Sequence, residues 1–207
     1  MNPTRPTTPV AHETRDAILD ATERLLARFG YKKTTMDDVA REAGIGKGTI
    51  YLHFPSKEEV ALCSIDRIVD RLLRRLRAVA AGPEAPDRRL RDMLLTRVLF
   101  RFDSVHDYSQ SLDDLLEALR PAYLARRQGY FDAEAEVLAG VLEEGRAAGV
   151  FRFDDPFVAA HTLLLATNSL LPYSLSAREL GKRKEVQEKA GRIADLLLTG
   201  LLRRGPR

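Results

Sequence analysis

The 207-residue sequence has very little cysteine and no long apolar run. Its single cysteine, Cys63, excludes an intramolecular disulfide, and the apolar neighbours predict a small buried side chain rather than a reactive thiol. No stretch approaches the roughly 18 apolar residues of a membrane-spanning helix, and no apolar leader opens the chain. These absences favour a protein of the cytoplasm.

The usual signatures of catalysis are also missing. The histidines are scattered without the spacing of metal ligands, at His12, His53, His106 and His161. There is no phosphate-binding loop, no nucleophile elbow and no motif of paired carboxylates. We therefore expect neither an enzyme nor a cofactor or metal site.

The composition is that of an ordinary globular protein. With 44% hydrophobic and 30% charged residues, the chain can form one ordinary domain or two small ones. The net charge of +3 is only weak support for a nucleic-acid partner, because modest basicity is common. Apolar residues recur at helical spacing and not in strand-like alternation, which predicts an all-α fold.

The N-terminal region begins with a predicted flexible arm, residues 1–12, in which three prolines stand among threonines and little can be buried. Apolar positions then predict a helix over residues 14–30. A second helix is expected from residue 36 to about 43, with Thr35 as its N-cap and Gly44 as its stop.

A third short helical segment is predicted over residues 46–54, only a few residues after the stop at Gly44, so two short helices must cross sharply, as in a helix-turn-helix. Ile50 and Phe54 share one face and would pack on the preceding helices. The remaining surface carries small, donor-bearing and aromatic residues: Lys47, Gly48, Thr49, Tyr51, Leu52 and His53. Their donors could reach phosphate oxygens and base edges, although taken singly Tyr51 and His53 could also form the half-buried rim of a small core.

Two ordered motifs span this region, F-G-Y-x-x-T-T-M-x-D-V-A-x-E-A-G and G-K-G-T-I-Y-x-H-F-x-S-K-E-E. Residues 14–60 thereby resemble the DNA-binding domain of the TetR family of bacterial transcription regulators. The resemblance implies DNA phosphate contacts from Thr35, Tyr51, His53 and Lys57. It implies base contacts from Lys47, Gly48, Thr49 and Leu52.

The sequence departs from the family pattern at two positions. Gly46 stands where the family usually has a serine that caps the recognition helix, a change that costs a few tenths of a kcal/mol. Leu52 stands at a variable position that is often polar or aromatic, and a leucine there can contact a thymine methyl group but cannot donate a hydrogen bond.

A helical second domain is predicted over residues 58–207, after a helix-turn-helix domain of residues 13–57. A long helix at about 57–80 would connect the two domains, and Gly82, Pro83 and Pro86 break the chain after it. Further helices are predicted at about 87–105, 112–119, 121–148, 156–171 and 184–203.

The last two predicted helices are very apolar, so they are either wholly internal or in contact with another subunit. The TetR resemblance implies the second possibility, a homodimer whose last two helices form a four-helix bundle and which reads a palindromic double-stranded DNA operator. A dimer is also favoured because one short recognition helix contacts too few base pairs for useful specificity.

The resemblance further implies a small-molecule pocket in the second domain. Polar residues embedded among apolar neighbours are the candidates to line it: Arg101, Tyr123, Tyr130, His161 and Asn168. Each could instead be an ordinary buried, hydrogen-bonded side chain or a dimer contact. For Arg101, a salt bridge to a nearby acid competes with the binding of a carboxylate ligand.

Together, these patterns predict a ligand-responsive repressor that binds its operator as a dimer and is released by a small, largely apolar effector. The alternative is a constitutive architectural or global DNA-binding dimer without an inducer. No membrane partner is expected.

Overall fold

The computed structural model describes residues 9–106, 112–171 and 181–202, which belong to two compact units. The first unit comprises Met1–Arg67 with Gln110–Arg120, and the second comprises Ile68–Ser109 with Pro121–Arg207. Apart from one isolated bridge between Phe151 and Leu202, the regular elements within the described residues are helices, which confirms the all-α prediction. None of these helices is both long and apolar enough to cross a bilayer.

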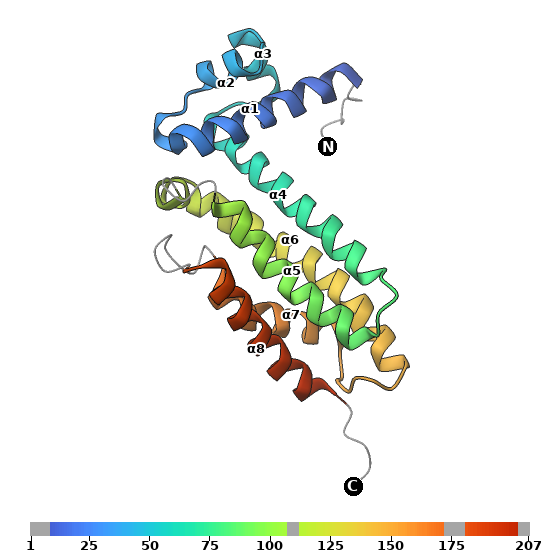
Figure 1. Ribbon diagram of the computed structural model, residues 1–207. Coiled ribbons are helices and arrows are strands. Elements are labelled where there is room, and N and C mark those ends of the chain that lie inside the picture. The colour runs from blue at the N-terminus through green and yellow to red at the C-terminus, as the bar shows by residue number, and fades with distance from the viewer. Residues whose placement is uncertain (1–8, 107–111, 172–180, 203–207) are drawn as a thin grey trace. The chain divides into compact units, whose positions relative to one another are not determined.

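Helix α1 of the first unit (Pro9–Lys33) begins earlier than expected (Figure 1). The expected arm ended at residue 12, but Pro9 to His12 are helical, because proline is tolerated at the first helical position, where no intrahelical donor is needed. The rest of the arm lies outside the described residues. Gly30, the expected stop, interrupts the helix with a positive φ of 77°, after which three more residues are helical.

Helices α2 (Met36–Glu42) and α3 (Lys47–His53) form the predicted helix-turn-helix (Figure 1). The predicted N-cap is confirmed, and Thr35 forms a capping box with Asp38. The turn between the helices depends on Gly44, whose φ of 69° is a conformation that favours glycine. Gly46 caps α3 without any side-chain hydrogen bond, as its lack of a hydroxyl requires.

The core of the first unit gathers residues from α1, α2, α3 and the start of helix α4 (Lys57–Ala80). Ile50 from α3 and Phe54, the residue that directly follows α3, are fully buried in it, as predicted, and Cys63 from α4 is also buried there. An isolated helix of seven residues is unstable in water, so this burial is what maintains α3.

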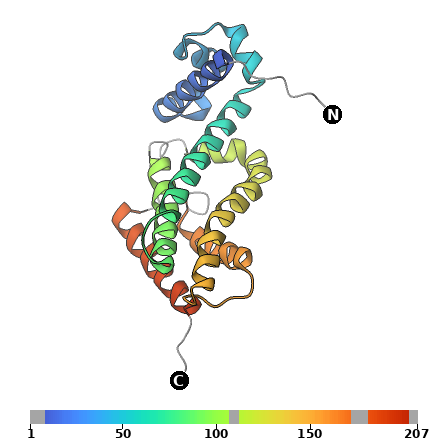
Figure 2. The ribbon, with the colours of Figure 1, turned by 90° about the vertical axis from the view of Figure 1, so that its right-hand side faces the viewer.

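The second unit is a helical bundle built around α5 (Pro86–His106). Helix α6 (Leu112–Ala147), which belongs to this unit from Pro121 onward, and helix α8 (Arg183–Leu201) lie on opposite sides of α5 (Figure 2). Helix α7 (Pro156–Thr167) continues into a short 3₁₀ helix, Asn168–Leu170. We expected two helices separated at Pro121, but α6 is continuous through it. Proline removes one intrahelical donor, a local cost that a long helix can tolerate without ending.

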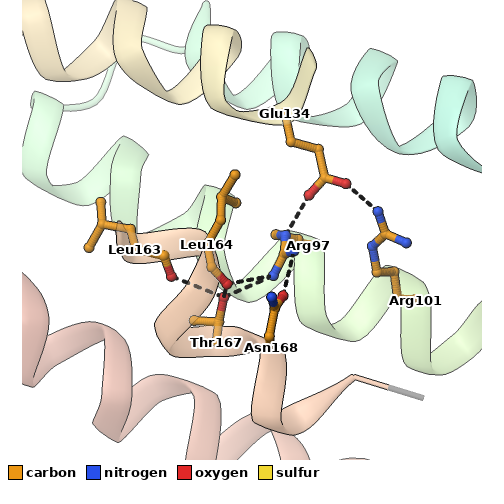
Figure 3. Close-up of polar contacts among 7 residues, drawn as sticks. All are labelled: Arg97, Arg101, Glu134, Leu163, Leu164, Thr167 and Asn168. Carbon is orange, nitrogen blue, oxygen red and sulfur yellow. Dashed lines mark hydrogen bonds and ion pairs between the residues drawn. The ribbon is translucent and has the colours of Figure 1, made fainter. Parts of the chain in front are cut away.

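A charged network is buried at the centre of the second unit (Figure 3). Arg97 of α5 is fully buried and donates to Glu134 of α6, to Thr167 and to Asn168, at 2.5, 2.9 and 3.0 Å respectively. Arg97 also donates to the carbonyl of Leu164 in the last turn of α7, where a cation is favourable for the helix dipole. Arg101 donates to the second oxygen of Glu134. The network thus joins three helices and fixes the end of α7.

The Glu134 carboxyl is held in its ionised form. Burial opposes its ionisation, but the guanidinium groups of Arg101 and Arg97 outweigh this effect and lower its pKa below the usual value. A carboxyl group with a lowered pKa in the folded state stabilises the protein at neutral pH. That contribution is lost as the pH falls from the unfolded-state pKa through the folded-state pKa.

We predict that Glu134→Gln lowers the free energy of unfolding by about 3–5 kcal/mol at pH 7, because two buried guanidinium groups lose their counter-charge. Urea denaturation measures this loss. The difference in unfolding free energy between the variant and the wild-type protein should shrink as the pH falls below 4.5, the ordinary pKa of a glutamate. Below that pH, the ionised Glu134 carboxyl stabilises the wild-type protein progressively less. The exposed Glu136 on the same helix supplies the control, and Glu136→Gln should change stability by less than about 0.5 kcal/mol. Equal effects of the two substitutions would contradict the account.

Candidate nucleic-acid interface

Helix α3 turns one face into the core and the other to solvent. Ile50 and Phe54 are fully buried, whereas Tyr51 is 47% and Leu52 is 85% exposed. Thr49 and His53 are half-buried at the edges of the outer face. The structure therefore brings the six predicted DNA-facing residues of α3 to one surface, with Leu52 standing furthest into solvent.

Two glycines leave the start of this surface open. Gly48 is exposed, and a methyl group added to it would meet nothing within 4 Å. A methyl group on Gly46 would meet only the Thr49 hydroxyl, at 3.7 Å. Neither glycine is required by the packing of the free protein, so the backbone at Gly48 is free to approach a ligand closely.

Lys57 lies at the first residue of α4 and is positioned by α1. Its ammonium donates to the carbonyl of Tyr31 at 3.0 Å and lies 4.2 Å from the centre of the Tyr31 ring. The Tyr31 hydroxyl donates in turn to Glu58. Burial, and then the nearby Glu58 carboxylate, raise the pKa of Tyr31 to about 12. Lys57 keeps further N–H donors for a phosphate, but its stem is held in place.

The sequence patterns assigned no role to Tyr31. Tyr31 is the third residue of the F-G-Y motif, but its contact with Lys57 joins positions 26 residues apart. A pairing of that range has no local signal, so the motif alone could not show it.

The hydroxyl and the backbone N–H of Thr35 already form hydrogen bonds within the protein. Its hydroxyl donates to Asp38 Oδ2 at 2.6 Å, and its backbone N–H donates to the same oxygen at 3.1 Å. These hydrogen bonds, from the side chain and then the backbone of Thr35, lower the pKa of Asp38. The predicted phosphate contact would therefore require the hydroxyl of Thr35 to exchange its partner, and it stays a prediction.

Lys47, the first residue of α3, is also paired. Its Nζ donates to Asp37 Oδ2 of α2 at 2.9 Å, and both side chains are at least half exposed to solvent. The hydrogen bond from Lys47 to Asp37, together with the attraction of that carboxylate, raises the pKa of Lys47. Lys47, which is predicted to contact a base edge, is thus held by a carboxylate of the neighbouring helix α2.

The five predicted pocket residues are divided among three places in the second unit. Arg101 and Asn168 belong to the buried Glu134 network, where the competing salt bridge of Arg101 is realised. The rings of Tyr123 and Tyr130 on α6 lie with their centres 6.1 Å apart and their planes tilted by 44°. His161 lies 3.1 Å from the Asp132 carboxylate and packs against Phe157.

The sequence patterns did not identify the buried pair of Arg97 and Glu134. Glu134 stands on α6 three residues after the buried Phe131 and beside the buried Ala135, so a charge on the apolar face of a helix was the available signal. Among the described residues, no three side chains of His, Cys, Asp or Glu are grouped as a metal ion would require.

Known proteins resemble this chain in sequence and fold. Residues 18–62 match the family described as bacterial regulatory proteins, tetR family. An uncharacterised HTH-type transcriptional regulator of Bacillus subtilis, YhgD, is 30% identical over 153 residues, covering 71% of this chain and 76% of that protein. The transcriptional repressor KstR2 of Rhodococcus jostii is 31% identical over 144 residues, covering 68% and 69% of the two chains.

A solved structure has a similar fold over nearly the whole length. The crystal structure of a TetR-family transcriptional regulator from Pectobacterium atrosepticum matches with a TM-score of 0.76, covering 97% of this chain and 100% of that one. The two sequences are 21% identical, so this likeness supports the fold alone.

We predict that Gly48→Ala weakens DNA binding without lowering the stability of the folded protein. The added methyl group meets no atom in the free protein and favours the helix, so stability should stay the same or rise by up to about 1 kcal/mol. DNA affinity should fall about tenfold because the methyl group holds α3 away from the duplex. Thermal unfolding and fluorescence anisotropy with labelled DNA measure the two quantities.

The control for Gly48→Ala is Gly46→Ser, which places a capping hydroxyl where there is room. It should stabilise α3 by a few tenths of a kcal/mol and leave DNA binding unchanged. Wild-type affinity in the Gly48→Ala protein would show that DNA does not approach this position closely.

Proposed function

The chain belongs to the TetR family of bacterial regulatory proteins, and from this premise we propose that it is a ligand-responsive repressor which binds a palindromic operator as a dimer. At the coarser level, it is a helix-turn-helix transcriptional regulator, a DNA-binding protein and not an enzyme. Its site of action is the cytoplasm, where bacterial operators lie. The proposed effector is a small, largely apolar molecule.

The observation that carries the proposal is the outer face of α3. A packed core holds the helix through Ile50 and Phe54, so the opposite face presents its side chains in a fixed arrangement. In the proposed complex this face enters the major groove, where Lys47, Thr49 and Leu52 meet base edges. Tyr51, His53 and Lys57 contact the phosphates on either side and set the register.

The proposed dimer is supported by apolar side chains left exposed on α7 and α8. Val158 and Leu165 on α7 are 63% and 62% exposed, and Leu196 on α8 is 76% exposed. Other residues of the same helices, such as Leu164 and Ala194, are fully buried, so these exposed side chains lie on the parts of α7 and α8 that the core does not cover. Burying them against a second copy would stabilise a two-fold dimer, whose symmetry would then appear in a palindromic operator.

The proposed effector site lies in the second unit. Tyr123 and Tyr130 offer aromatic surface together with hydroxyl donors, which suits an apolar molecule carrying a polar group. Arg101 already pairs with the carboxylate of Glu134, which compensates its positive charge, and this favours a neutral or weakly polar effector. A coupling of about 1–3 kcal/mol between effector and operator is sufficient for release.

A constitutive architectural dimer without an inducer is the competing function, and thermal shifts separate the two. A molecule that binds the folded protein raises its melting temperature, and an inducer must in addition release DNA. Identical melting and DNA binding across a metabolite library would favour the architectural role.

The proposed DNA contacts predict two kinds of variant. Tyr51→Ala and Lys57→Ala should weaken binding to every duplex, and Lys57→Ala, which removes a cation, should also flatten the dependence on salt by about 0.9 in the log–log slope. Leu52→Ala should keep the slope and lose preference at particular base pairs. Titrations at several salt concentrations, with DNA flanking the gene and with scrambled DNA, measure both effects. Equal behaviour of the two kinds would contradict the assignment.

The proposed dimer predicts that Leu165→Glu or Leu196→Glu weakens self-association by about 100-fold or more, because a two-fold interface buries each substituted position twice. Sedimentation velocity over a range of concentrations measures the change. Leu124 on α6 is also exposed, at 46%, and Leu124→Glu is the matched control that should leave the dimer intact. A loss of self-association in the control alone would place the interface elsewhere.

A further inference from the structure

Lys47 is the only lysine or arginine in α3, and its partner is an acid on the other helix of the helix-turn-helix. The Nζ atom lies 2.9 Å from Oδ2 of Asp37, although both side chains are exposed enough to be solvated separately. Asp37 lies within the first turn of α2 and takes no part in the capping box, which Thr35 and Asp38 complete. Its carboxylate is therefore available to Lys47.

The position of Lys47 explains why this partner matters. At the first residue of a helix, the dipole and the free backbone N–H groups disfavour a cation. Asp37 stands near the start of its own helix, where the dipole favours an anion. A carboxylate beside the ammonium compensates the unfavourable charge and fixes the direction in which the lysine points. The raised pKa of Lys47 is consistent with this pairing.

We propose that Asp37 is a specificity-determining residue, which holds the Lys47 ammonium and so favours binding at a base edge over binding to phosphates alone. The inference rests on the proposed function, because it concerns how the same surface discriminates among DNA sequences. It adds a residue that is not itself among the predicted DNA contacts.

The chemistry of the two groups supports this role. An ammonium has three N–H donors, of which Asp37 occupies one, and the other two can serve acceptors such as N7 and O6 of guanine. A non-specific complex offers Lys47 only phosphates, and it brings the Asp37 carboxylate toward those negative charges. Asp37 therefore lowers the affinity for DNA when Lys47 can reach only phosphates. It lowers the affinity little when a base edge accepts hydrogen bonds from Lys47.

The test compares Asp37→Asn with the wild-type protein on two duplexes of equal length, one carrying DNA from the flank of the gene and one scrambled. The variant should bind the scrambled duplex about two- to fivefold more tightly, with a salt slope steeper by up to about 0.9. It should gain less on the flanking duplex, so the ratio of the two affinities falls. In the free protein, an NMR titration should show a lower Lys47 pKa in the variant than in the wild-type protein.

Two further variants separate the role of Asp37 from a simple loss of negative charge. Glu42 on the same helix is similarly exposed and pairs with Arg24 at 2.8 Å, so Glu42→Gln makes the same charge change without touching Lys47. It should leave the affinity ratio unchanged. In a Lys47→Met background, Asp37→Asn should no longer change the ratio, because the residue acts through the lysine.

Each remaining outcome counts against the inference. An equal fall of the ratio in Glu42→Gln, or a fall that persists in the Lys47→Met background, would overturn the role of Asp37. An unchanged ratio in Asp37→Asn would do the same while leaving the proposed function intact. Failure of the wild-type protein to prefer any duplex would overturn both together.

Discussion

The helix-turn-helix unit depends on the burial of two side chains, Ile50 in helix α3 and Phe54 directly after it. Helix α3 has only seven residues, too few to persist in water, and its outer face has to stay free for a partner. Ile50 and Phe54 are therefore the positions through which the core fixes its direction. The helix caps and the turn at Gly44 place the neighbouring helices where they can cover these two side chains. The packing of α1 has the same effect.

Around this helix, three of the residues expected to meet DNA already form polar contacts within the protein. Lys47 is paired with Asp37, Lys57 with the carbonyl and ring of Tyr31, and Thr35 with Asp38. Such pairing restricts flexible side chains before binding and so reduces the entropy lost in a complex. In the proposed complex, a chain of modest net charge would therefore rely on placed donors more than on excess positive charge.

Much of this arrangement could be predicted from the sequence because its signals are local. Thr35 and Gly44 mark helix ends, Thr35 by its capping side chain and Gly44 by its positive φ, and the spacing of Ile50 and Phe54 identifies the buried side of this segment. Prolines were less informative, since Pro9 begins a helix and Pro121 lies within one. The long-range pairs could not be predicted: Arg97 and Glu134 are 37 residues apart, and only the folded bundle brings them together. The exposed side of α3 was therefore accessible to sequence reasoning, while the polar centre of the second unit was not.

The most direct measurement of the central claim is selection of bound sequences by the purified full-length protein from a random pool of double-stranded DNA. The account predicts enrichment of one short sequence in two copies related by two-fold symmetry, with centres about 10 base pairs or a multiple of that apart. It also predicts that the enrichment weakens steeply as salt is raised. Recovery of no preferred sequence, or of a single asymmetric site, would contradict it.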